Sequence, residues 1–84
     1  MKGDDIIEIK IIGTNCSNGM KLKKMVRRAI DSSEIHIDFE ELNSENAKNT
    51  YNIKNTPALI IDGNVKSEGK VLTEREISKL LVQE

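Results

Sequence analysis

Several residue types that mark specialised binding sites are scarce in this sequence. It has no Trp, one Tyr and one Phe among 84 residues, so it lacks an aromatic surface on which nucleic-acid bases could stack. A single Cys excludes an intramolecular disulfide and a zinc site built from several cysteines, and it fits a reducing compartment. The lone His36 has no cysteine or acidic partner at ligand spacing, so we expect no metal site.

The sequence also lacks an excess of charge and any long apolar run. Thirteen Lys and Arg residues against fourteen Asp and Glu give a formal net charge of −1, which predicts no general attraction to nucleic acid or membrane. No run approaches the roughly 20 apolar residues that span a bilayer, and the N-terminal "MKGDDIIEIK" has no apolar segment typical of a signal peptide. We therefore expect a cytoplasmic protein, with a monomer as its simplest state.

What the sequence does have is a globular balance of residues. Hydrophobic residues make up 37% of the chain and charged residues 32%. No repeat, linker or low-complexity tract interrupts it, so residues 1–84 are expected to form one domain. At this length the chain lies near the lower limit for burying a core without a metal or a disulfide.

The first half of the chain predicts a strand followed by a long helix. The segment "DIIEIKIIG" (5–13) carries five β-branched Ile residues and is typical of a central strand buried on both faces. After a polar break at 13–17, apolar residues recur every three or four positions, which predicts an amphipathic helix. The helical stripe consists of Leu22, Met25, Val26, Ala29 and Ile30.

The second half predicts two more helices and three strands. "EIHIDFEEL" (34–42) alternates between apolar and polar residues, with His36 on the outer face, and a short polar helix is expected at about 44–51. "TPALIIDGNVKS" (56–67) predicts a hairpin that turns at Asp62–Gly63. "TEREISKLLVQ" (73–83) opens a helix with the capping-box spacing of Thr73 and Glu76. The order βαβαββα predicts an α/β fold with parallel first strands, an antiparallel final hairpin and helices on both faces of the sheet.

The most chemically suggestive stretch is "GTNCSNG" (13–19). Cys16 lies where the long helix is predicted to begin, with Asn15, Ser17 and Asn18 beside it. The helix dipole and unpaired N–H groups at a helix N-terminus favour a thiolate, so we expect Cys16 to be accessible and reactive. The alternative is that the thiol is a small, inert, buried side chain.

Together these motifs resemble the thioredoxin-fold proteins of the small prokaryotic redox-active disulfide protein 2 family. That family has a strand, a Gly-Thr-x-Cys-x-x-Cys turn into a helix, and later a Thr-Pro-Ala-Leu segment followed by Asp-Gly. "GTNCSNG" (13–19) and "YNIKNTPALIIDG" (51–63) match these segments, and the resemblance extends over about 6–81. It implies a four-stranded mixed sheet in the strand order 2-1-3-4.

The resemblance also implies roles for individual residues. Cys16 falls on the nucleophilic cysteine, whereas Gly19 replaces the resolving one, so the CxxC motif is degenerate. A cis peptide bond is expected before Pro57, and the Thr56 backbone could pair with a substrate peptide as an added strand. The expected catalytic residue is Cys16, and the expected binding residues are Thr14, Asn15, Ser17, Asn18, Gly19, Thr56 and Pro57.

The glycine at position 19 can be interpreted in two ways. It could reflect drift or an altered function, or it could open a space as in monothiol glutaredoxins, in which glutathione takes the place of the resolving thiol. The sequence has no evident glutathione-binding signature. The Lys and Arg residues of the first helix are likewise ambiguous, since they could form a solvated face or attract an acidic partner or the carboxylates of glutathione.

These observations support functions of different classes. The first is a thioredoxin-like protein that uses Cys16 alone for thiol–disulfide exchange with glutathione or with protein thiols and disulfides, without a cofactor. The alternative is a non-catalytic thioredoxin-fold module that binds proteins, and a third is a sensor that dimerises through an intermolecular disulfide. One cysteine excludes a dithiol reductase by stoichiometry, and the sequence leaves open whether the chain is an enzyme.

Overall fold

The observed elements follow the predicted order. The computed structural model describes residues 6–33, 36–43 and 45–83. The elements are β1 (Ile7–Ile12), α1 (Ser17–Ser32), β2 (Ile37–Leu42), α2 (Glu45–Tyr51), β3 (Ala58–Ile61), β4 (Asn64–Glu68) and α3 (Glu74–Gln83). The predicted second strand and second helix extended over 34–35 and 44, which lie outside the described residues.

The four strands form one mixed sheet in the order β2-β1-β3-β4, as expected. β1 pairs in parallel with β2, so that Ile9 lies opposite Phe39, and antiparallel with β3, so that Ile11 lies opposite Leu59. β3 then pairs antiparallel with β4. The parallel pairing has a consequence for the site, because the C-terminal ends of β1 and β2 meet at the same edge of the sheet.

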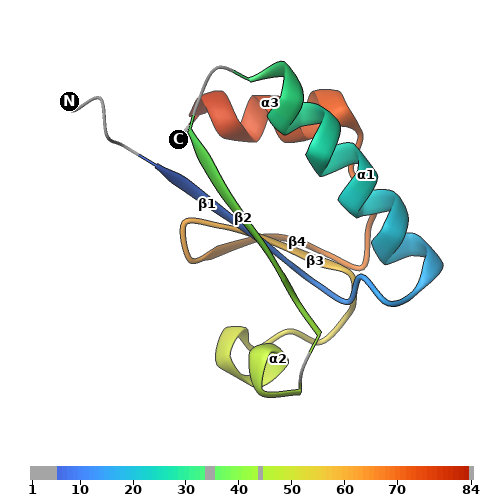
Figure 1. Ribbon diagram of the computed structural model, residues 1–84. Coiled ribbons are helices and arrows are strands. Elements are labelled where there is room, and N and C mark those ends of the chain that lie inside the picture. Colours follow the sequence, from blue (N-terminus) through green and yellow to red (C-terminus); the bar gives the residue numbers. More distant parts are fainter. Residues whose placement is uncertain (1–5, 34–35, 44, 84) are drawn as a thin grey trace.

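The helices divide between the two faces of the sheet. α1 and α3 cover one face and α2 covers the other, as Figure 1 shows. β1 contributes Ile9 and Ile11 to the core under α1 and α3, and Ile12 to the smaller core under α2. Burial on both faces is thus confirmed for most of the strand. It fails for Ile6, which is 51% exposed because it precedes Ile7, the first residue paired with β2.

Two local signals in the sequence give the expected geometry. Asp62 and Gly63 both have positive φ, +51° and +82°, the conformation that a two-residue hairpin turn requires. At the start of α3 the Thr73 N–H donates to Glu76 Oε1 at 2.9 Å, and the Glu76 N–H donates to Thr73 Oγ1 at 3.1 Å. The predicted capping box is therefore present.

Candidate thiol site

Cys16 occupies the N-cap of α1. Its backbone is extended (φ −120°, ψ 169°), and its carbonyl accepts a hydrogen bond of 2.9 Å from the Met20 N–H. The side chain is exposed, and its S–H donates to the Gly13 carbonyl oxygen at 3.5 Å. The alternative of a buried thiol is therefore wrong, because Cys16 packs into neither core.

The other expected site residues separate into exposed and buried groups. The exposed group beside Cys16 consists of Asn15, Ser17 and Asn18, and Thr56 is exposed on the opposite loop. The buried group consists of Thr14, Gly19 and Pro57. The side chains of the first group are open to solvent, whereas the residues of the second group pack within their own loops.

A tight contact joins the Cys16 loop to the proline loop. Gly13 has a φ of +94°, and a Cβ on it would lie 2.7 Å from Thr56 Cβ. The peptide bond between Thr56 and Pro57 is cis. Gly13 therefore brings two segments that are far apart in sequence into contact, and its carbonyl is the group that accepts the Cys16 S–H.

Gly19 is packed against the same loop. It lies in the first turns of α1 and is buried, and a Cβ there would overlap the Gly13 carbonyl oxygen and lie 2.8 Å from Thr14 Cα. The neighbouring atoms belong to the backbone, so no side-chain rotation can relieve this overlap. The space that a side chain would need at position 19 is filled by the protein itself, and the glycine opens no cavity.

Asn43 holds the Gly13–Thr14 segment and was not among the residues expected from sequence. Its Oδ1 accepts hydrogen bonds from the backbone N–H groups of Thr14 (2.9 Å) and Gly13 (3.2 Å), and its Nδ2 donates to Thr14 Oγ1 at 3.2 Å. The sequence could have indicated this contact, because Asn43 directly follows β2, and the C-terminal ends of the parallel strands β1 and β2 meet at one edge of the sheet. Its side chain thereby fixes the loop that positions the acceptor for Cys16.

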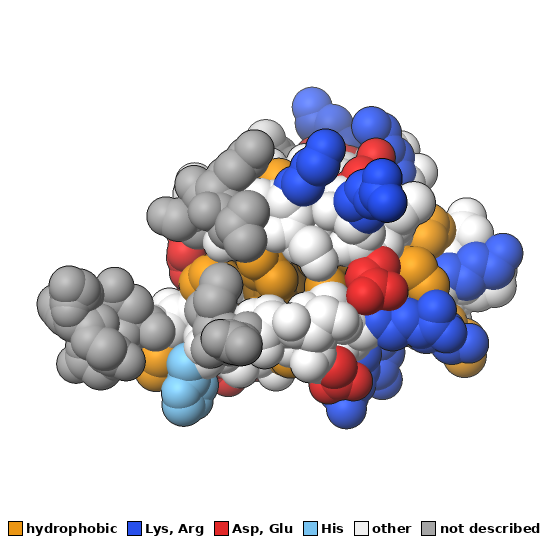
Figure 2. Space-filling view, turned by 90° about the horizontal axis from the view of Figure 1, so that it is seen from above, with side chains coloured by type: hydrophobic (Ala, Val, Ile, Leu, Met, Phe, Trp, Pro, Cys, Tyr) orange, Lys and Arg blue, Asp and Glu red, His pale blue; other side chains and the backbone are white. Residues whose placement is uncertain are grey.

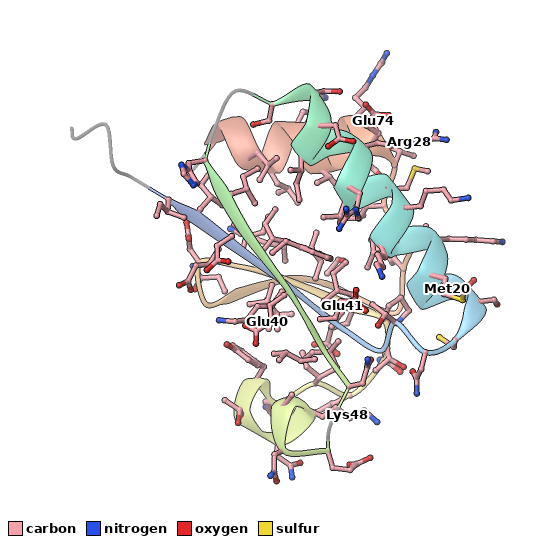
Figure 3. The ribbon with its side chains drawn as sticks, viewed as in Figure 1. Met20, Arg28, Glu40, Glu41, Lys48 and Glu74 are labelled. Atoms are coloured by element: carbon pink, nitrogen blue, oxygen red, sulfur yellow. The ribbon has the colours of Figure 1, made fainter. Side chains whose placement is uncertain are left out.

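Glu41 extends this network to α1. Glu41 Oε1 accepts a hydrogen bond of 2.9 Å from Thr14 Oγ1. Glu41 Oε2 forms an ion pair with Lys23 Nζ at 2.6 Å. Figure 3 labels Glu41 between β2 and the N-terminal half of α1. The hydrogen bond from Lys23, followed by that from Thr14, holds the pKa of Glu41 below its usual value.

Glu41 therefore predicts a pH dependence of stability. Because its pKa is lower in the folded than in the unfolded protein, its stabilising contribution is complete above the ordinary value of 4.5 and is lost as the pH falls through the lowered pKa. We expect Glu41→Gln to unfold more easily than the native protein at pH 7 and equally easily in strong acid, measured by urea unfolding across that range. Glu40→Gln, which alters the adjacent exposed carboxylate, is the matched control, and a difference independent of pH for Glu41→Gln would contradict the assignment.

His36, Tyr51 and Ile53 lie on other segments than the Cys16 loop. His36 is exposed, as expected, and Ile53 packs in the core under α2 with Tyr51 half-buried at its margin. Within residues 6–33, 36–43 and 45–83 no group of three or more His, Cys, Asp or Glu side chains is arranged to hold a metal ion. In the same part of the chain no helix is long and apolar enough to cross a membrane.

The sheet order, the helices on its two faces and the cysteine at the start of α1 beside a cis-proline loop define a thioredoxin-like protein. A sequence model described as Thioredoxin domain matches residues 7–82. The chain is also 32% identical over 76 residues to a thioredoxin of Methanothermobacter thermautotrophicus (strain Delta H), an alignment that spans 90% of this chain and 99% of that protein. The chain belongs to the thioredoxin family.

Proposed function

We propose that this chain is a monothiol member of the thioredoxin family that exchanges disulfides through Cys16 alone. The observation that carries the proposal is the exposed thiol at the N-cap of a 16-residue helix, in a sequence without a second cysteine. The thiol is open to a partner disulfide, and the N-terminus of a helix is a position at which nucleophilic cysteines are often found.

The proposed reaction is a single thiol–disulfide exchange. The Cys16 thiolate attacks one sulfur of a partner disulfide, a new S–S bond forms to Cys16, and the second partner sulfur leaves with the bonding electron pair and takes a proton from water. Gly19 offers no thiol to release this mixed disulfide, so a second external thiol must do so. Glutathione or a thiol of the partner protein would serve, and no cofactor is needed.

The proposed binding residues have two roles. Asn15, Ser17 and Asn18 would flank the incoming disulfide, and the exposed Thr56 backbone would pair with an extended partner segment. Thr14, Gly19 and Pro57 are buried, so their proposed role is to hold these loops in place. We further propose that the protein works as a monomer in the reducing cytoplasm.

Adduct formation with oxidised glutathione tests the proposal. We expect the reduced protein to form a one-to-one mixed disulfide, visible by intact-mass spectrometry, faster than a short unstructured cysteine peptide does at pH 7. Cys16→Ser should abolish the adduct, and Asn46→Ala, an exposed substitution on α2, should form it. A rate no greater than that of the peptide would contradict an activated thiol and would sink the monothiol function.

The retained proline loop supports a second candidate, a module that binds proteins without turnover. The Thr56–Pro57 loop lies against Gly13 while position 19 has lost its thiol. A partner recovered equally by native protein and by Cys16→Ser would favour this binding function. An oxidant that instead produces a Cys16-linked dimer would favour the sensor function.

A further inference from the structure

The outer face of α1 forms a groove that begins at the thiol site. The groove has a volume of 480 Å³, with Thr14 lining it at the Cys16 loop and Asp31 at the other end of the helix. Met20 lines the groove and lies one turn after Cys16, to whose carbonyl its N–H donates. The groove is therefore within reach of residues that neighbour a disulfide at Cys16.

The groove is strongly cationic. It is lined by Lys23, Lys24, Arg27 and Arg28 against a single carboxylate, Asp31, although the whole chain has a formal charge of −1. Figure 2 looks onto the α1 and α3 side of the molecule, where Lys and Arg side chains outnumber Asp and Glu. The positive charge is thus a local property of this face.

Two of these cationic side chains are not engaged in ion pairs within the described part of the chain. Lys23 is paired with Glu41 at 2.6 Å, and Arg27 adds to the positive field at the same carboxylate. Lys24 and Arg28 form no ion pair with any residue in the described part of the chain. They lie four residues apart, so both project from the same side of α1 and can bind one acidic segment.

Met20 gives the groove an apolar end. Its side chain is 62% exposed, the largest exposed fraction among the large hydrophobic residues that the structure describes. Figure 3 shows it at the N-terminal end of α1, with Arg28 nearer the C-terminal end. Methionine adapts to differently shaped apolar side chains, and exposed methionines are common on binding surfaces. A simple solvated helix face explains the charges but does not explain this side chain beside the thiol.

We infer that the α1 groove docks an acidic segment of the protein whose disulfide Cys16 attacks, with an apolar residue of that segment against Met20. The inference rests on the proposed function and specifies its substrate class. A protein segment fits better than nucleic acid, because the groove holds Asp31 among its cations, adjoins Glu41 and offers no aromatic side chain for stacking. The groove also includes Thr14, two residues before the residue that would react, and Met20, four residues after it.

Reaction of Cys16 with activated peptide disulfides tests this inference. Two peptides would carry one cysteine as a disulfide to thionitrobenzoate, followed by a Leu and four Glu in one peptide and by a Leu and four Gln in the other. In low salt we expect the Glu peptide to react about tenfold faster, as electrostatic steering permits, and the difference to shrink in high salt. The released thionitrobenzoate is followed by its absorbance.

Two double charge-reversal variants test whether the preference for the Glu peptide arises at the α1 groove. Lys24→Glu with Arg28→Glu should remove the preference for the Glu peptide. Arg75→Glu with Lys79→Glu, at the same spacing on α3 and with the same change in net charge, should retain it. The salt dependence of the native protein needs no variant, so the test survives a folding defect in either double variant, which circular dichroism would detect.

Each remaining outcome is decisive. Equal rates for the two peptides, or equal effects of the two double variants, would overturn the docking inference while leaving the monothiol function intact. Failure of Cys16 to react faster than a free cysteine peptide with either disulfide would instead remove the proposed function itself. Tighter binding of a single-stranded oligonucleotide than of the Glu peptide, lost in the α1 variant, would reassign the groove to nucleic acid.

Discussion

Gly19→Ala should destabilise the protein by at least about 2 kcal/mol, the cost typical of forcing extra atoms into a packed site. In an ordinary helix interior the same change stabilises by up to about 1 kcal/mol, because Ala has the higher helix propensity. The sign is reversed here because the new Cβ would overlap the Gly13 carbonyl oxygen and lie 2.8 Å from Thr14 Cα. Backbone atoms must move, and with them the loop that carries Cys16.

Urea unfolding followed by circular dichroism measures this effect. Asn18→Ala is the matched control, because it makes an exposed substitution to Ala in the same turn of α1. A Gly19→Ala protein as stable as the native one would show that the Gly13–Thr14 segment moves freely. The result also bears on the resolving cysteine that the family resemblance implies at position 19, since a cysteine there would bring the same Cβ and the same overlap.

Asn43→Ala should cost about 2 kcal/mol, because it leaves the buried Thr14 N–H without its acceptor. Thr14 is only 7% exposed, and its N–H donates to Asn43 Oδ1. The Gly13 N–H would keep its longer bond of 3.3 Å to the Leu42 carbonyl, so the main loss falls on Thr14. We also expect slower reaction of Cys16 with oxidised glutathione, since the Gly13–Thr14 segment that leads into the Cys16 loop would no longer be held in position.

Thermal or urea unfolding together with the adduct assay checks both parts of this prediction. Asn46→Ala on α2 is the control, because it removes the same side chain from an exposed helical position. A loss of stability equal to that of the control would mean that water replaces the Asn43 oxygen without cost. A large loss of stability with an unchanged Cys16 rate would assign Asn43 a structural role alone.

Features that depend on near neighbours in the chain could be predicted from the residues alone. The Ile-rich β1, the stripe of α1, the Asp62–Gly63 turn and the Thr73–Glu76 cap all follow from periodicity, φ preference or hydrogen bonds over three residues. Together with the family motifs they predicted the strand order and the position of Cys16 at the start of α1.

Only the tertiary structure decided how the thiol loop is held. Asn43 reaches Thr14 across 29 positions, and Glu41 reaches it across 27, because parallel pairing of β1 and β2 brings their C-terminal ends together. The family resemblance predicted that Gly19 replaces a resolving cysteine, whereas the structure shows a close approach there between the α1 backbone and the preceding loop. Such contacts depend on distances between segments, and no local pattern of residues encodes those distances.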